Sequence, residues 1–336
     1  MRARTSEAVA AVCLAAISTH SVAQQANPVV TTLSVFAGAA GGLWQSKDWG
    51  GSWQLVKLGS DESLQGLGSV TCILPQGPRV YAGGEGGVVL SEDFGAVWRR
   101  VAIEGPIQIL LASRYPAADP TVLAGGSRGL SISRDHGSTF KEVSLLGTAV
   151  LRLEWPGPDL VLGTSQGVLV SSDGGRSFRG PGAGLPEGSV MALALSSFYG
   201  NDPVLFAGVG QTGVYRSSDG ARTWVPSGLQ GRAVNDLAWI GPLLYAATDR
   251  GLFRSEDAGK VWAPLGKELA ERQLTRLLFP LMPASGAEIF VGTDEGIYRS
   301  SDGGLNWLRT SFPKERVLAL ATFPAPASAV KSKRAP

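Results

Sequence analysis

Short apolar runs, each interrupted by a glycine-rich bend, recur along most of the chain. Residues 289–299 (Ile-Phe-Val-Gly-Thr-Asp-Glu-Gly-Ile-Tyr-Arg) show the arrangement, with an apolar segment on either side of the bend. The side chains alternate along each segment and show no helical period, which indicates β-strands. The pattern therefore predicts an all-β chain of short antiparallel strands joined by tight turns.

A polar motif of the form Ser-x-Asp-x-Gly-x-x-aromatic follows the second strand of each such pair. It occurs seven times, with its aspartates at Asp48, Asp93, Asp135, Asp173, Asp219, Asp257 and Asp302. Subtraction of successive numbers gives spacings of 45, 42, 38, 46, 38 and 45 residues. A repeat of this length is typical of one four-stranded blade of a β-propeller. Seven copies predict seven blades.

The residue types of the motif fit a turn between two strands. A short Asp side chain can accept hydrogen bonds from the backbone N–H groups just ahead of it, and Gly supplies a positive φ. Only Ala221 departs from the Gly position. The aromatic residue carries apolar area that we expect to pack between blades. One aspartate per blade is also too widely spaced to form the carboxylate pair of a glycosidase, so we expect a structural role. His136, inside one motif, is expected to be an exposed turn residue.

An apolar pair three residues apart marks the innermost strand of each blade. The pairs are Val70/Ile73, Ile107/Leu110, Val150/Leu153, Val190/Leu193, Val234/Leu237, Leu274/Leu277 and, after the last motif, Val317/Leu320. Regular alternation would place one residue of each pair on each face of the strand. The first unit, from Leu33 to Val56, has no such strand before it. Residues 316–323 are therefore predicted to complete that blade and close the ring, which leaves no exposed sheet edge.

These repeats resemble a known family. The motif is similar to the Asp-box, or bacterial neuraminidase repeat. The longer unit Gly-(Ile/Leu/Val)-(Tyr/Phe)-Arg-Ser-x-Asp-Gly-Gly-x-x-Trp resembles the repeat of photosystem II stability/assembly factors, over about residues 33–323. Sialidases, xyloglucan hydrolases and sortilin-type receptors carry the same motif. The resemblance thus implies the propeller fold and leaves the function open.

The two ends of the chain differ in composition from the repeats. A basic start, an apolar run over residues 8–17 and the small residues Ser21-Val22-Ala23 predict a signal peptide, 1–23, cleaved before Gln24. An ordinary apolar helix is the alternative. The expected domain is a propeller over 24–323, exported to the periplasm or the cell exterior. Residues 324–336 are poor in large apolar side chains and contain Lys331, Lys333 and Arg334, which predicts a disordered basic tail.

The composition also limits the chemistry. A net charge of +2 gives no electrostatic argument for binding nucleic acid. Cleavage would leave Cys72 and His136 as the last Cys and His, so neither an intrachain disulfide nor a Cys/His metal site is expected. Glycine-rich bends such as residues 83–87 lead from strand to strand rather than into a helix, unlike a phosphate-binding loop. We assign no cofactor, no metal and no catalytic residue.

Charged residues nevertheless occur where the innermost strands should face a central channel. Two positions after the first apolar residue of each pair, the sequence reads Cys72, Ile109, Arg152, Ala192, Asp236, Arg276 and Ala319. Arg152, Asp236 and Arg276 are predicted to face one another, with Asn235 and Glu154 close by. Two arginines and one aspartate could bind a carboxylate, a sulfate or an acidic side chain. Alternatively the channel is wet and these side chains are solvated or paired with one another. Turns between second and third strands add Arg128 and Arg250 at the same end.

The first functional hypothesis is a non-enzymatic exported scaffold that binds another protein. Resemblance to the assembly factors implies a newly made membrane protein as partner and arginines on one propeller face as contacts, for which Arg152, Arg276, Arg128 and Arg250 are candidates by position only. A glycoside hydrolase or sialidase-like enzyme is the alternative. Against it, the sialidase tripeptide Arg-Ile-Pro is missing, and xyloglucan hydrolases divide their two acidic residues between two propellers. A third hypothesis is glycan binding through Trp155 and Trp239, although both are expected to pack inside.

Overall fold

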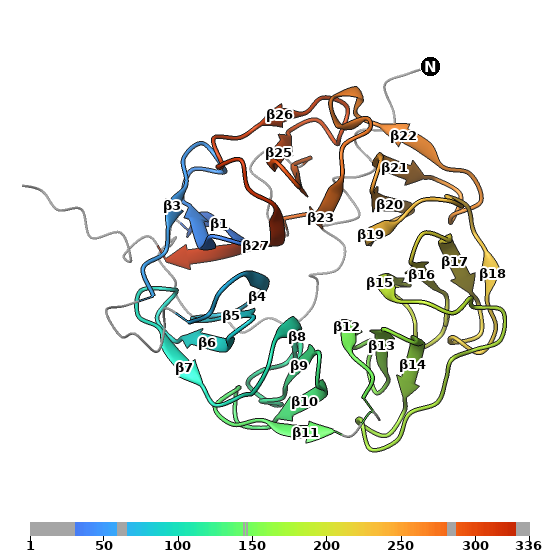
Figure 1. The fold of residues 1–336 in the computed structure, drawn as a ribbon, viewed down its shortest axis with the longest axis horizontal. Coiled ribbons are helices and arrows are strands. Elements are labelled where there is room, and N and C mark those ends of the chain that lie inside the picture. Colours follow the sequence, from blue (N-terminus) through green and yellow to red (C-terminus); the bar gives the residue numbers. More distant parts are fainter. Residues whose placement is uncertain (1–30, 59–65, 144, 146, 281–286, 327–336) are drawn as a thin grey trace, which may run out of the picture.

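A ring of seven sheets surrounds a central axis in this computed structural model, which describes residues 31–58, 66–143, 145, 147–280 and 287–326 (Figure 1). Each sheet is one blade, with one strand near the axis and the others stacked outwards. The predicted all-β, seven-bladed propeller is confirmed. Within the described ranges the single helical element is a 3₁₀ turn, η1 (Lys267–Leu269). The predicted signal peptide and residues 327–336 of the predicted tail lie outside the described residues.

Each blade begins with its innermost strand at the axis and ends with its outermost strand at the rim. From the axis outwards, the first blade contains β27 (Val317–Pro326), β1 (Thr31–Ala39), β2 (Gly42–Ser46) and β3 (Gln54–Leu55), and the second β4 (Val70–Gln76), β5 (Arg79–Gly84), β6 (Gly87–Ser91) and β7 (Arg99–Val101). The third contains β8 (Ile107–Ala112), β9 (Val122–Gly126), β10 (Gly129–Ser133) and β11 (Lys141–Val143), and the fourth β12 (Val150–Glu154), β13 (Leu160–Thr164) and β14 (Gly167–Ser171). The fifth contains β15 (Val190–Leu195), β16 (Leu205–Val209), β17 (Gly213–Ser217) and β18 (Val225–Pro226). The sixth contains β19 (Val234–Ile240), β20 (Leu243–Thr248), β21 (Gly251–Ser255) and β22 (Ala263–Leu265), and the seventh β23 (Leu274–Leu278), β24 (Ile289–Thr293), β25 (Gly296–Ser300) and β26 (Leu308–Arg309).

The C-terminal strand closes the ring, as the unmatched innermost strand predicted. β27 pairs antiparallel with β1, and Leu320 lies opposite Ala37. The strand continues to Pro326, beyond the predicted end at Phe323. Phe323 is 1% exposed and its ring lies edge to face with Phe36, with centroids 6.2 Å apart. The last strand is therefore part of the hydrophobic core although it stands near the end of the chain.

A β-bulge near the start of each innermost strand corrects the prediction that each apolar pair divides between two faces. In β4, Val70 lies opposite Gly84 but Cys72 already lies opposite Gly83, so Thr71 is an extra residue. Because the bulge adds one residue, Val70 and Ile73 point to the same face and both pack toward the first blade. Cys72 points the other way, toward the third blade. Both faces are buried, as expected, but the residue after the bulge is aimed at the following blade.

The fourth blade lacks the predicted outermost strand. β12, β13 and β14 form a three-stranded sheet, and a single bridge between Val170 and Arg179 stands where the fourth strand would begin. The next residues are Gly180 and Pro181. Proline has no N–H to donate to a neighbouring strand, so pairing ends at this point. The chain instead passes to the fifth blade, where the N–H of Ala183 donates to the carbonyl of Arg222 at 2.9 Å.

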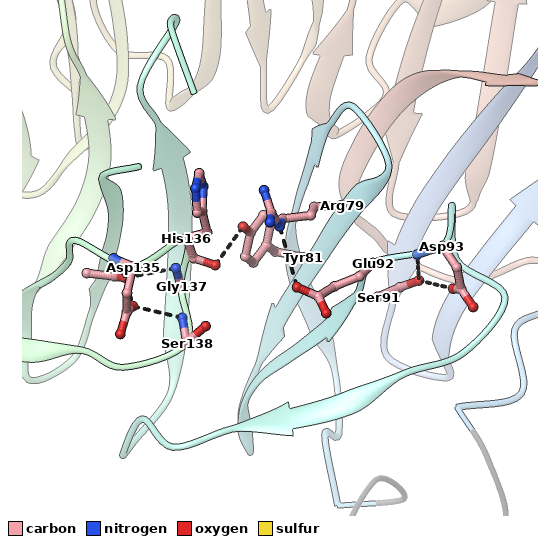
Figure 2. A network of polar contacts seen from close by, with 10 residues as sticks. Arg79, Tyr81, Ser91, Glu92, Asp93, Asp135, His136, Gly137 and Ser138 are labelled. Atoms are coloured by element: carbon pink, nitrogen blue, oxygen red, sulfur yellow. Dashed lines mark hydrogen bonds and ion pairs between the residues drawn. The ribbon is translucent and has the colours of Figure 1, made fainter. Parts of the chain in front are cut away.

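Each Ser-x-Asp turn is closed by its own side chains, and Figure 2 shows the turns of the second and third blades. In the third blade the Ser133 hydroxyl donates to Asp135 Oδ1 at 2.7 Å, and the same oxygen accepts the N–H groups of Ser138 and Thr139 at 3.0 and 2.9 Å. In all seven turns the serine hydroxyl donates to the aspartate, which accepts the N–H four residues later. This geometry belongs to a residue that holds a turn.

The position after each aspartate also has a positive φ, which the motif alone did not predict. His136 has a φ of 56° and Ala258 the same value. Two successive positive φ angles match the right-handed twist of the flanking strands. His136 is half-buried rather than exposed. The hydroxyl of Tyr81 in the second blade donates to the carbonyl oxygen of His136 at 2.9 Å (Figure 2). This bond ties the turn of one blade to the preceding blade.

Candidate binding site at the centre of the ring

Arg152, Asn235, Asp236 and Arg276 come together at the centre of the ring, as the sequence predicted. Arg152 on β12 donates from Nη2 to the carbonyl oxygen of Asn235 on β19 at 2.9 Å. This bond joins the fourth blade to the sixth and passes the fifth. Ala192, in the equivalent position of the fifth blade, has only a methyl group there and leaves the path open. We call the four residues, together with Glu154, the hub cluster.

The β-bulges direct these side chains. Register shifts separate Val150 from Arg152, Val234 from Asp236 and Leu274 from Arg276. Asn235 is the extra residue in β19, and its Nδ2 donates to the carbonyl oxygen of Leu274 in the seventh blade at 2.7 Å. A bulge frees its residue from strand pairing, so the side chain can reach a neighbouring blade. The sequence showed that the apolar residues of each innermost strand are three positions apart, but it did not show that a β-bulge lies between them.

Asp236 bonds to backbone rather than to an arginine. Its Oδ2 accepts the N–H of Leu277 in the seventh blade at 2.8 Å, and its Oδ1 accepts the N–H of Leu237 at 3.1 Å. Each carboxylate oxygen thus has a fixed donor, which ties the sixth blade to the seventh. Such an aspartate is committed to the framework and is poorly placed to exchange protons with a substrate.

The two arginines of the hub cluster keep free donors. Arg276 donates from Nη1 to the carbonyl oxygen of Thr275 at 2.8 Å, and Arg152 donates in the same way to Leu151 at 2.7 Å. Neither guanidinium forms an ion pair with any residue in the part of the chain that the structure describes. A guanidinium has five N–H donors, so each has several left over. Of the two alternatives, pairing of the charged side chains with one another is not found among the described residues, whereas solvation by water in the channel agrees with their partial exposure.

Burial among protein atoms makes these positive charges costly. Loss of hydration, followed by the charge of Arg276, lowers the pKa of Arg152 to about 9. Loss of hydration also lowers the pKa of Arg276, partly offset by Asp236. Both groups remain protonated at neutral pH. Both are also partly accessible, so water or a ligand can reach them. Two like charges held together in this way favour an anionic ligand, which would restore the missing counter-charge.

Glu154 lies two residues beyond Arg152 on β12, and burial raises the pKa of its carboxyl group instead of lowering it. Burial raises its pKa from 4.5 to about 7, because the loss of hydration outweighs the attraction of Arg114 and Arg152. It is therefore about half protonated at neutral pH. Arg114 follows β8 at the strand end away from the hub arginines, and the sequence did not point to it. The hub cluster keeps a net positive charge, and more so in acid.

Arg128 and Arg250 lie at the predicted end of the ring but outside the hub cluster, because their turns stand beside the starts of the innermost strands. Arg128 forms ion pairs with Glu142 and Glu104, at N–O distances of 2.8 and 3.2 Å, so its charge is neutralised. Arg250 is exposed and lines a groove on the sixth blade. Trp155 and Trp239 pack inside as predicted, and Trp239 lies edge to face with Phe206 at 5.3 Å. They offer no aromatic platform for a sugar at the centre of the ring.

The described residues contain neither a membrane-spanning helix nor a metal cluster. No helix there has the length and apolar character needed to cross a bilayer. No set of three or more His, Cys, Asp or Glu side chains within the described ranges is arranged to hold a metal ion. Cys72 is 5% exposed, and burial raises its thiol pKa to about 12, so it is uncharged beside the hub arginines.

The fold defines the class: an all-β, seven-bladed propeller with a positively charged hub. No protein-family model matches the sequence, and no curated protein is detectably similar to it. Among solved structures, the chain is similar to a GH74 xyloglucanase from Xanthomonas campestris, with a TM-score of 0.66 and 19% identity, over 86% of this chain and 53% of that one. The chain thus spans about half the length of that enzyme.

Two other similar structures are single propellers of comparable length. YCF48 bound to a D1 peptide has a TM-score of 0.60 and 18% identity, over 82% of this chain and 97% of that one. YCF48 from Cyanidioschyzon merolae has a TM-score of 0.59 and 15% identity, over 80% and 95% of the two chains. At these identities the likeness concerns the fold alone.

Proposed function

We propose that the chain is a non-enzymatic, exported propeller that binds another protein and acts as an assembly scaffold. The observation that carries this proposal is the pair of hub arginines without ion-pair partners in the described structure, beside an aspartate whose oxygens are both held by backbone N–H groups. Unpaired guanidinium groups suit an acidic side chain or carboxylate of a partner. Export is part of the proposal and rests on the basic, apolar and small residues at the start of the chain.

The similar structures support this choice in a limited way. The similarity covers 97% of the YCF48 chain, and that protein has been solved with a D1 peptide bound. The xyloglucanase matches over only about half of its own length, so this chain has no counterpart for the remainder of that enzyme. These comparisons favour a protein partner. We propose an exported or membrane protein as that partner, because the resemblance of the repeats to assembly factors implies one.

A glycoside hydrolase is the second candidate, because Glu154 and Asp236 are close enough to influence each other's charge. Two neighbouring carboxyl groups, one of them with a raised pKa, are the arrangement of an acid and its partner in glycosidases. Against this, the hydrogen bonds from Leu237 and Leu277 already occupy both oxygens of Asp236. Hydrolysis of xyloglucan or of a sialoside, abolished by Asp236→Asn, would establish the enzyme and refute the scaffold.

Affinity capture tests the scaffold directly. The immobilised protein is incubated with detergent-solubilised membranes and with the soluble extract of the source organism, and bound proteins are quantified by mass spectrometry. We expect one defined partner to be enriched by the wild type and lost with the double variant Arg152→Gln/Arg276→Gln. Arg128→Gln is the matched control, because its guanidinium is already ion-paired and lies outside the hub cluster. Equal capture by all three proteins would refute binding through the hub.

A further inference from the structure

A groove of about 430 Å³ lies on the sixth blade, away from the hub cluster. Leu252 and Phe253 of β21 and Pro264 of β22 contribute apolar surface to it. Arg250, in the turn before β21, and Lys267 of η1 also line it. The volume is within the range of pockets that bind small molecules, and polar groups that converge on an apolar surface are typical of such pockets.

The groove carries a positive charge. Arg232, Arg250 and Lys267 line it together with one carboxylate, Glu271, which leaves a net charge of two. The guanidinium of Arg232 lies 4.7 Å from the centroid of the Phe253 ring and donates to the carbonyl oxygen of Arg250 at 3.2 Å. In the described part of the chain none of the three cations takes part in an ion pair.

In the third blade, the arginine equivalent to Arg250 forms ion pairs with carboxylates. Arg128 precedes the first glycine of β10 as Arg250 precedes that of β21, and two carboxylates, Glu142 and Glu104, bind it. Glu142 lies opposite Ser131 in the strand pairing, and the corresponding residue opposite Phe253 is Pro264.

The sixth blade also lacks a counterpart of Glu104, the second carboxylate that binds Arg128. Glu104 stands three residues before the innermost strand β8, and the residue three before β19 is Gly231. The same arginine position is therefore neutralised in one blade and left without a carboxylate partner in the other. Arg232, two residues before β19, adds a further cation where the third blade has Gly105.

We infer that this groove binds a small organic anion: a carboxylate, sulfonate or phosphate group on an apolar body. The anionic group lies between Arg250 and Lys267 and replaces the carboxylates present in the third blade. The apolar body packs on Leu252 and Phe253, where burial of apolar area adds affinity that an inorganic ion would lack. The site is separate from the hub cluster and does not depend on the scaffold role.

A matched pair of fluorescent probes tests the site in the purified full chain. 8-Anilinonaphthalene-1-sulfonate combines an anionic group with an apolar body, and N-phenyl-1-naphthylamine is the same body without the sulfonate. We expect saturable binding of the sulfonate probe and much weaker binding of the uncharged one. Arg250→Gln should weaken binding of the sulfonate about tenfold, as expected for loss of one charge-assisted contact. Pro264→Glu, which restores the carboxylate of the third blade, should weaken it similarly.

Arg128→Gln is the control and should leave the affinity of the sulfonate probe unchanged. Melting curves of all variants verify that the fold is intact. The proposal is overturned if neither Arg250→Gln nor Pro264→Glu alters the affinity, or if the uncharged probe binds as tightly as the sulfonate. Partner capture by Pro264→Glu separates the two proposals, because a partner bound through the hub arginines predicts that capture stays at the wild-type level.

Discussion

Arg152 on β12 and Asn235 on β19 are hydrogen-bonded across the centre of the ring, over the fifth blade that separates their own. The β-bulges in β12 and β19 direct the side chain of Arg152 and the backbone at Asn235 toward neighbouring blades. Ala192, at the equivalent position of the fifth blade, has a small side chain that leaves room for the bond. The bond places a positive charge beside Arg276 without neutralising either one. Two desolvated arginines held close together contribute little to the stability of the fold, so their arrangement is better explained by ligand binding.

Replacement of Arg152 by Met should leave the fold at least as stable as before. The variant loses hydrogen bonds to Asn235 and Leu151, each worth about 1.5–3 kcal/mol for a charged donor. It also removes a desolvated charge and its repulsion with Arg276, a penalty of several kcal/mol. We expect a free energy of unfolding within about 1 kcal/mol of the wild type or above it, measured with urea. A loss of more than about 3 kcal/mol would mean that Arg152 is a structural cross-link instead.

Glu154 should make stability fall as pH rises. Its pKa is raised from 4.5 to about 7, so the folded state binds the proton more tightly than the unfolded chain does. The stability contributed by the protonated form is complete below pH 4.5 and is lost as pH rises through 7. Since Gln mimics protonated Glu, Glu154→Gln should match the wild type at about pH 4 and exceed it at about pH 8. Partial access to water reduces the difference. Urea unfolding at both pH values measures it, and identical pH profiles would contradict the assignment.

The Ser-x-Asp turns should contribute stability that is lost in acid. The hydrogen bond from the Thr223 hydroxyl, aided by the N–H of Thr223 and the hydroxyl of Ser217, lowers the pKa of Asp219 to about 2. Such a contribution is present above the ordinary pKa of 3.8 and disappears as pH falls through about 2. Asp219→Ala should cost about 1–3 kcal/mol at pH 7. Ser218→Ala, an exposed position in the same turn, is the control and should cost little. Equal effects of the two substitutions on the melting temperature would argue against the turn-closing role.

Removal of the C-terminal strand should unfold the ring. Deletion from Arg316 onwards removes β27, exposes the edge of β1 and leaves Phe36 without Phe323. We expect rapid limited proteolysis and no cooperative melting transition. Deletion from residue 327 onwards keeps all of β27 and should melt like the full chain. A stable, protease-resistant product of the longer deletion would show that the ring can close without β27.

The architecture was accessible from the sequence because it repeats. The regular Ser-x-Asp spacing predicted the seven blades, and an innermost strand missing at one end and spare at the other predicted the β27–β1 closure. The outer edge of the fourth blade was predicted wrongly, although Pro181, which has no N–H to pair, was a visible signal.

The hub cluster was accessible only in part. Repeat alignment brought Arg152, Asp236 and Arg276 together, since equivalent positions of equivalent strands lie at the same height in a ring. The bulges were not foreseen, because an apolar spacing of three also fits a regular strand buried on both faces. Strand register decides whether each turn arginine has a carboxylate partner. It places Glu142 at the position that serves Arg128 and Pro264 at the equivalent position near Arg250.

Site-specific photo-crosslinking tests the central claim, that a partner binds at the hub end of the ring. Gln211, in the turn between β16 and β17, is exposed at the end where the hub arginines lie, and Phe198, between β15 and β16, is 76% exposed at the opposite end. With a photoreactive residue at either position, we predict a crosslink to the captured partner from 211 and none from 198. A crosslink from 198 alone would place the partner on the other face and contradict the role of the hub arginines.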